Sequence, residues 1–121
     1  MSASPRVLIV DESSETRQVL REVLQSRGMQ ILEAQRADEG LALARCEHPD
    51  LIVVDLELEN GAPQQVSASF AATSHDQHTP LILIGTARVR RTAPPGGAFL
   101  QKPYHYAPLI RKIEQLLADA A

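Results

Sequence analysis

Residues 51–55 read Leu51-Ile-Val-Val-Asp55, four apolar residues that run directly into a carboxylate. A short apolar run rich in β-branched residues predicts a strand buried on both faces, as in a parallel sheet. In open α/β sheets, binding sites lie beyond the carboxyl ends of the strands. Asp55 therefore either belongs to a site or only begins a turn, a common role for aspartate. This stretch alone leaves both interpretations open.

The composition is that of an ordinary globular domain. The chain has 121 residues, of which 44% are apolar and 22% charged, and its net charge is −3. This length predicts one domain over residues 1–121, and the charge favours neither nucleic acid nor a membrane as a partner. No apolar run predicts a transmembrane helix. The single cysteine, Cys46, fits a reducing compartment, so we expect a cytoplasmic protein. Its thiol is expected to be packed or half-packed rather than reactive.

Strands and helices are predicted to alternate along the chain. Strands are expected at residues 6–10, 30–34, 51–55, 80–84 and 98–101, and helices between 13 and 28, over 37–47, from Pro63 to a frayed end at 73–76, and over 105–119. Residues 88–97 leave little room for a helix, so the helix before the last strand is predicted to be reduced or absent. Such alternation predicts parallel strands joined by right-handed crossovers.

Polar side chains follow four of these strands. Asp11 and Glu12 follow the first strand, Asp55 the third, Thr86 the fourth and Lys102 the fifth. Because parallel strands end at one edge of the sheet, these side chains are expected to share a crevice. Three carboxylates in one crevice repel one another unless a cation lies among them. Oxygen ligands of this kind suit Mg²⁺, which is completed by waters and a phosphoryl group.

A phosphoryl group on Asp55 would find partners in the same crevice. Aspartate is a known nucleophile towards phosphoryl groups, and a metal neutralises the charge that develops in the transfer. Lys102 supplies a point charge and Thr86 a hydroxyl donor for the phosphoryl oxygens. The residues after the first strand contain no glycine-rich loop, which argues against a dinucleotide or P-loop site.

Four short motifs carry a resemblance to a known family: Val10-Asp11-Glu12, Val54-Asp55, Thr86-Ala87 and Lys102-Pro103. In this order, and on these elements, they resemble the receiver domain of two-component response regulators, along essentially the whole chain. The resemblance implies a flavodoxin-like, doubly wound α/β fold. Its five-stranded parallel sheet would have the strand order 2-1-3-4-5.

The resemblance also implies a role for the acids. Asp55 looks like the phosphoacceptor, which takes phosphate from a phosphohistidine of a histidine kinase or a histidine phosphotransfer protein. Asp11 and Glu12 resemble the acidic pair that holds Mg²⁺, together with Asp55 and the backbone carbonyl of Glu57. Glu12 stands where the family more often has aspartate, and its extra methylene predicts weaker or water-mediated metal binding.

The resemblance implies a switch as well. Thr86 matches the hydroxyl that moves towards the phosphate, and Phe99 matches the aromatic residue that changes rotamer with it. Lys102 matches the lysine that pairs with the phosphate, and its bond to Pro103 is expected to be cis, as is usual in the family.

The implied function is that of a stand-alone receiver that switches contacts with a downstream protein target. It would catalyse only its own phosphorylation and dephosphorylation at Asp55, so we do not expect an enzyme with an external substrate. A monomer or a weak dimer is expected, because many receivers dimerise through the helix that is cut down here.

Three alternatives stay open. Glu12 and the shortened helix favour a degenerate receiver that binds partners without phosphorylation. A hydrolase of the aspartyl-phosphate type is disfavoured, because no substrate cap or second general acid follows Asp55. Arg88 either pairs with Glu57 across the site or belongs to a solvated basic loop.

Overall fold

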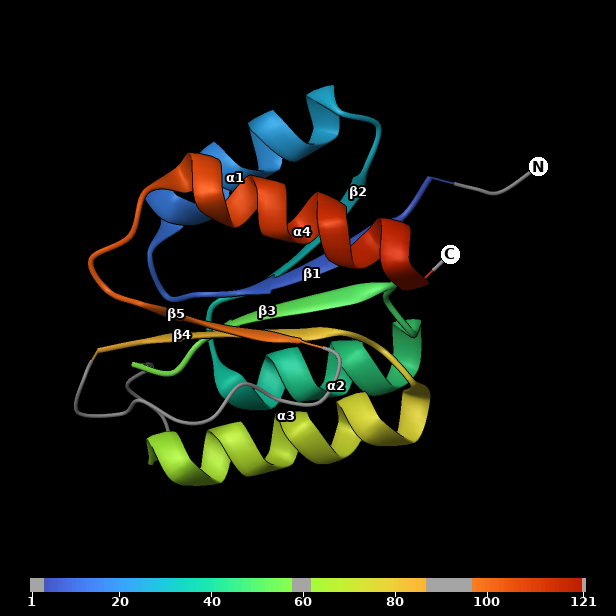
Figure 1. The fold of residues 1–121 in the computed structure, drawn as a ribbon. Helices are drawn as coiled ribbons and strands as arrows, with labels where there is room; N and C mark the ends of the chain where they lie inside the picture. Colours follow the sequence, from blue (N-terminus) through green and yellow to red (C-terminus); the bar gives the residue numbers. More distant parts are fainter. Residues whose placement is uncertain (1–3, 58–61, 87–96, 121) are drawn as a thin grey trace.

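The computed structural model describes residues 4–57, 62–86 and 97–120. At its centre lies a parallel sheet in which the described strands have the order β2-β1-β3-β4-β5 (Figure 1). The strands are β1 (Arg6–Val10), β2 (Gln30–Ala34), β3 (Leu51–Asp55), β4 (Leu81–Gly85) and β5 (Ala98–Gln101). The predicted α/β fold and its strand order are therefore confirmed.

Two helices cover each face of the sheet (Figure 1). One face carries α1 (Ser14–Ser26) and α4 (Tyr106–Ala120), and the other carries α2 (Ala37–Glu47) and α3 (Pro63–Gln77). Alternate residues of β1 enter the two layers of the core, Val7 and Ile9 towards α1 and α4, Leu8 and Val10 towards α2 and α3. Strands β3 and β4 are buried along their whole length, which explains their continuous apolar sequence.

Local sequence sets where the helices begin and how closely they pack. The Ser13 side chain caps α1 by accepting a hydrogen bond from the Thr16 N–H at 3.1 Å. Pro63 occupies the first turn of α3, where its missing N–H costs nothing. In α2, a Cβ at Gly40 would lie 2.6 Å from a methyl carbon of Val10. Only glycine therefore lets α2 approach the end of β1.

Several details of the prediction are corrected. Helix α3 does not fray at residues 73–76 but continues to Gln77, because Thr73 and Ser74 are buried and His78 ends the helix in a left-handed conformation. Strand β4 and helix α4 are each shifted by one residue from the predicted bounds. Cys46 is exposed, not packed.

Two further predictions involve residues that lie outside the described ranges. The reduced helix is expected at residues 88–97, all of which except Gly97 lie outside the described residues. The expected pairing of Glu57 with Arg88 involves one described residue, Glu57, and one that lies outside them, Arg88. Among the described helices, none combines the length and the apolar character needed to cross a bilayer.

Candidate functional site

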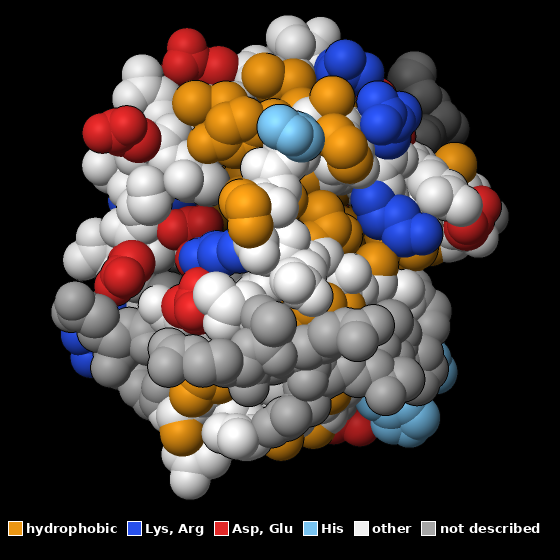
Figure 2. Space-filling view, turned by 60° about the vertical axis from the view of Figure 1, so that its left-hand side comes forward, with side chains coloured by type: hydrophobic (Ala, Val, Ile, Leu, Met, Phe, Trp, Pro, Cys, Tyr) orange, Lys and Arg blue, Asp and Glu red, His pale blue; other side chains and the backbone are white. Residues whose placement is uncertain are grey.

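The carboxyl ends of the strands bring the predicted site residues to one edge of the sheet. Asp55 is the last residue of β3, and Lys102 follows β5. The Lys102 N–H donates to the Gly85 carbonyl at 2.7 Å, so Lys102 lies beside the end of β4, which Thr86 follows. Figure 2 shows this side of the molecule, where acidic and basic side chains lie next to one another below an apolar area.

Lys102 forms a bridge between two carboxylates. Its Nζ lies 2.8 Å from Asp55 Oδ2 and 3.1 Å from Glu57 Oε1. The other oxygen of Asp55, Oδ1, accepts the Glu57 N–H at 2.9 Å. The Asp55 side chain is only 6% exposed, whereas that of Lys102 is 30% exposed. Both oxygens of a buried carboxylate are thus engaged, and one partner is a cation that solvent can reach.

Electrostatics keep Lys102 charged. Burial alone would lower the pKa of its ammonium group, but the hydrogen bond and the charge of Asp55, and then those of Glu57, outweigh burial and raise this pKa. Lys102 is therefore a permanent counter-ion near neutral pH. A phosphoryl group arriving at Asp55 would meet a positive charge that is already in place.

Asp11 is the second buried carboxylate of the edge. Burial raises its pKa, and the negative charge of Asp55 raises it further. A hydrogen bond from the Ser13 N–H to Asp11 Oδ1, at 2.8 Å, opposes the rise, as do the positive charges of Lys102 and Arg17. The site therefore contains more buried negative charge than its own cations neutralise.

This imbalance fits a divalent cation. Asp11 and Asp55 provide hard oxygen ligands, and Mg²⁺ usually takes one or two carboxylates and keeps several waters. Glu12, in contrast, is exposed. Within residues 4–57, 62–86 and 97–120, no group of three His, Cys, Asp or Glu side chains is gathered to hold a metal. The structure thus brings two of the predicted acids together and leaves the role of Glu12 as a prediction.

The predicted switch residues lie at the same edge or beside it. The Oγ1 atom of Thr86 is buried and has no hydrogen-bond partner in the described part of the chain. Burying a hydroxyl group in this way costs free energy unless a ligand supplies a hydrogen-bond partner. Phe99 is half-buried and packs against the core layer under α2 and α3. The Lys102–Pro103 peptide bond is cis, as predicted.

Two residues near the site were missed by sequence reasoning. Arg17 Nη1 donates to the backbone carbonyl of Asp11 at 2.5 Å. The hydroxyl of Tyr104 has a raised pKa, because of burial first and then the charge of Asp11, the neighbouring Tyr106 and the charge of Asp55. The position of Tyr104, directly after Lys102-Pro103, could have drawn attention to it. No spacing rule would have found Arg17.

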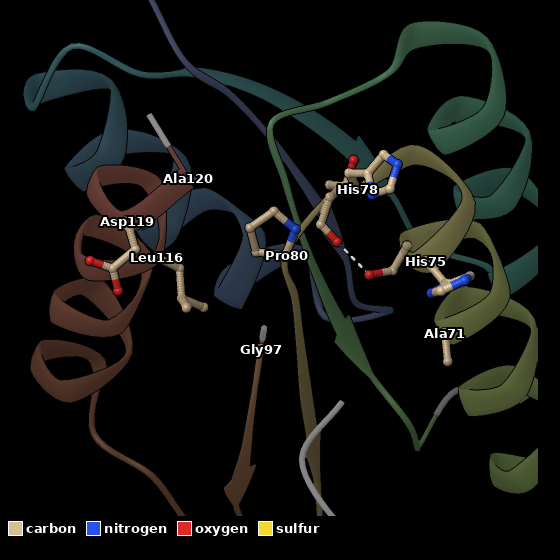
Figure 3. A pocket seen from close by; sticks show the side chains of 10 residues that line it. Ala71, His75, His78, Pro80, Gly97, Leu116, Asp119 and Ala120 are labelled. Carbon is tan, nitrogen blue, oxygen red and sulfur yellow. Dashed lines mark hydrogen bonds between the residues drawn. The ribbon is translucent and has the colours of Figure 1, made fainter. Parts of the chain in front are cut away.

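A hollow of about 570 Å³ lies at the opposite edge of the sheet and contains none of these residues. Figure 3 shows it between the ends of α3 and α4, with Pro80 and Gly97 between them. From α3 and its end come His75 and His78, and from α4 come Leu116 and Asp119. The hollow is thus remote from the paired carboxylates.

A doubly wound parallel sheet with two buried carboxylates at its carboxyl edge, one of them paired with a lysine, defines the class of protein: a flavodoxin-like domain with an acidic site at the strand ends. The chain belongs to the response regulator receiver domain family, whose sequence profile matches residues 7–114.

Curated relatives have the same extent. Protein PilH of Pseudomonas aeruginosa is 29% identical over 119 residues, which cover 93% of this chain and 98% of PilH. The polar-differentiation response regulator DivK of Brucella ovis is 27% identical, over 94% of this chain and 97% of DivK. A response regulator receiver protein of Sinorhizobium medicae has the same fold, with a TM-score of 0.78, 20% identity and 98% of each chain covered. Membership of the response regulator receiver domain family places the chain in two-component signalling.

Proposed function

We propose that the chain is a phosphoacceptor in a two-component system or phosphorelay, and that Asp55 takes a phosphoryl group from a phosphohistidine. The donor would be a histidine kinase or a histidine phosphotransfer protein. The observation that carries the proposal is the contact between Lys102 Nζ and Asp55 Oδ2 at 2.8 Å, beside the second buried carboxylate, Asp11. Ligands of open α/β sheets bind beyond the carboxyl ends of the strands, and a buried charge with a specific partner at that place is a candidate for a functional group.

The transfer follows from the chemistry of these groups. A carboxylate oxygen of Asp55 forms a bond to phosphorus, the bond from phosphorus to the imidazole nitrogen breaks, and the electron pair stays on that nitrogen. Lys102 and the Thr86 hydroxyl contact the transferred oxygens. Bound Mg²⁺ would neutralise the charge that develops in the transfer. Asp11 and Asp55 would hold the ion, with the Glu57 carbonyl and Glu12 as the further ligands that the family resemblance implies.

Phosphorylation would rearrange the bridge made by Lys102. A dianionic phosphoryl group competes with the Glu57 carboxylate for Nζ, which now lies 3.1 Å from Glu57 Oε1. Thr86 Oγ1, which has no hydrogen-bond partner among the described residues, would gain an acceptor, and the half-buried Phe99 could repack beside it. The changed surface would then bind a downstream protein target. The chain would act as a monomer or weak dimer in the cytoplasm, with no chemistry beyond its own phosphorylation and dephosphorylation.

A second function has two observations in its favour. Glu12 is exposed, and the described residues contain no group of three metal-ligating side chains. A degenerate receiver that binds partners without phosphorylation would have this geometry. The two functions differ in whether Asp55 reacts.

Intact mass spectrometry after incubation with acetyl phosphate and Mg²⁺ separates them. Phosphoryl transfer predicts the addition of one phosphoryl group, its loss in Asp55→Asn, and its retention in Asp50→Asn, a matched carboxylate change at the opposite edge of the sheet. A chain that gains no phosphoryl group from acetyl phosphate or phosphoramidate, and binds no beryllofluoride, would be a degenerate receiver.

A further inference from the structure

Asp11 is held in place by three hydrogen bonds. Its N–H donates to the Ala34 carbonyl at 3.0 Å, which ties it to the end of β2. Its Oδ1 accepts the Ser13 N–H at 2.8 Å, and its carbonyl oxygen accepts Arg17 Nη1 at 2.5 Å. The first joins two backbone groups, and the second joins the Asp11 carboxylate to a backbone N–H of its own turn. The third depends on one side chain.

Arg17 is itself fixed by an ion network. Its Nε lies 3.1 Å from Glu33 Oε1, and the second oxygen of Glu33 accepts Arg21 Nη1 at 2.5 Å. Glu33 lies on β2 beside Ile9 of β1, so it is one strand away from the turn that carries Asp11. The Arg17 side chain is only 14% exposed, which limits the alternative positions open to it. The network thus joins α1, β2 and the end of β1.

We infer that Arg17 is a positioning residue for Asp11, and that Glu33 and Arg21 hold Arg17 in the geometry this requires. The Arg17 guanidinium group, on α1, donates a hydrogen bond to the Asp11 carbonyl, while the Ser13 N–H orients the Asp11 carboxylate. The Asp11 carboxylate is thereby presented to the site it shares with Asp55. This inference rests on the proposed function, because it takes Asp11 as a ligand of Mg²⁺.

The chemistry of the contact supports positioning rather than simple attachment of a helix. Arginine has a planar fork of donors, so one guanidinium group can serve the Asp11 carbonyl and the Glu33 carboxylate together. Residues that orient a metal ligand in this way typically change metal affinity about 10- to 100-fold when they are removed. Lysine at the same position would present a single ammonium nitrogen, without the planar fork that places Nε against Glu33 and Nη1 against the Asp11 carbonyl.

The chain offers a matched control in Arg6. Its Nη1 donates to the Glu47 carbonyl at 2.8 Å and its Nη2 pairs with Glu47 Oε1 at 2.6 Å. Arg6 thus joins a backbone carbonyl and a glutamate, as Arg17 does, but at the amino end of β1. Arg6→Met removes the same kind of contact and leaves Asp11 untouched.

Magnesium titration of the unphosphorylated protein, followed by calorimetry, tests the inference. We expect the Mg²⁺ dissociation constant to rise about 10-fold in Arg17→Met, less in Arg17→Lys and Glu33→Gln, and not at all in Arg6→Met. The melting temperatures of all four variants are measured alongside. Equal Mg²⁺ affinity in wild type and Arg17→Met would overturn the inference, whatever happens to the melting temperature.

A metal-free measurement keeps the inference separate from the proposed function. Amide hydrogen exchange of the Ser13 N–H reports its bond to Asp11 Oδ1 without Mg²⁺. Faster exchange of Ser13 in Arg17→Met, with no change in Arg6→Met, supports positioning of Asp11; unchanged exchange in both variants contradicts it. If wild type binds no Mg²⁺ but Ser13 responds as expected, the metal site of the proposed function fails and the positioning of Asp11 stands.

Discussion

Charged groups are stabilised differently at the two edges of the sheet, the amino edge where the strands begin and the carboxyl edge where they end. At the amino edge, the Arg6 side chain pairs with Glu47, and the backbone N–H of Arg6 donates to Asp50 Oδ2 at 2.8 Å. The Arg6 and Glu47 side chains are 32% and 46% exposed, so water also solvates their charged groups. The ion-paired groups at this edge therefore need no ligand to complete them.

At the carboxyl edge, burial replaces solvation. Asp11 and Asp55 are both buried and repel each other, and the buried Thr86 Oγ1 has no hydrogen-bond partner in the described part of the chain. Proteins break the rules of polar satisfaction mainly where function requires it. The contrast between the edges indicates that the carboxyl edge is arranged for a cation and an anion that complete it.

Removing the central cation of each edge gives the largest expected difference. In chelator, Lys102→Met leaves the buried Asp55 without its ammonium partner and should lower the free energy of unfolding by about 2 kcal/mol. Arg6→Met breaks a more exposed pair and should cost less than about 1 kcal/mol. Urea unfolding of both variants measures the difference, and equal losses would remove the contrast between the edges.

Replacing a buried acid should change the free energy of unfolding less than Lys102→Met does, and should raise it. Because the pKa of Asp11 is raised in the folded protein, the ionised carboxylate destabilises the fold. That cost is absent below the unfolded pKa, about 3.8, and complete above the folded pKa. Without metal at neutral pH, Asp11→Asn should therefore melt above wild type, with an advantage that fades as the pH falls through this window.

Melting curves across the acid range provide the measurement, with Asp50→Asn as the control. Asp50 accepts a hydrogen bond from the Arg6 N–H, so its replacement should not stabilise the protein. An Asp11→Asn variant that is less stable than wild type at neutral pH would show that the Asp11 charge is well solvated.

Two threonines give the smallest contrast. Thr86→Val removes a buried hydroxyl that has no hydrogen-bond partner in residues 4–57, 62–86 and 97–120, and should leave stability unchanged or raise it slightly. Thr79→Val, at the amino edge, removes a hydroxyl that donates to the Pro49 carbonyl at 3.4 Å and should cost about 1 kcal/mol. Chemical unfolding of both variants measures this difference in stability. A larger loss in Thr86→Val would mean that its hydroxyl is already satisfied.

Much of the site could be predicted because it depends on strand direction alone. Asp11, Asp55 and Lys102 each follow an apolar strand, and parallel strands end at one edge. The contact of Arg17 with Asp11 could not be predicted, because it depends on the rotation of α1 and on the register of β2.

Other details depended on tertiary burial. The polar stretch at residues 73–76 resembles a loop in sequence, but Thr73 and Ser74 are buried and α3 continues through it. Cys46 lies in a helical pattern beside Ala44, which is buried, and yet is itself exposed on α2. Glu12 follows the same strand as Asp11 and nevertheless lies in solvent.

Trapping the phosphorylated residue tests the central claim most directly. Borohydride reduces an aspartyl phosphate to homoserine, and peptide mass spectrometry then locates the reduced residue. After incubation with acetyl phosphate and Mg²⁺, phosphorylation of Asp55 predicts homoserine at position 55 alone, in wild type and in Arg6→Met. Homoserine at another carboxylate, or none in a protein that binds Mg²⁺, would contradict the assignment of the carboxyl edge as a phosphoacceptor site.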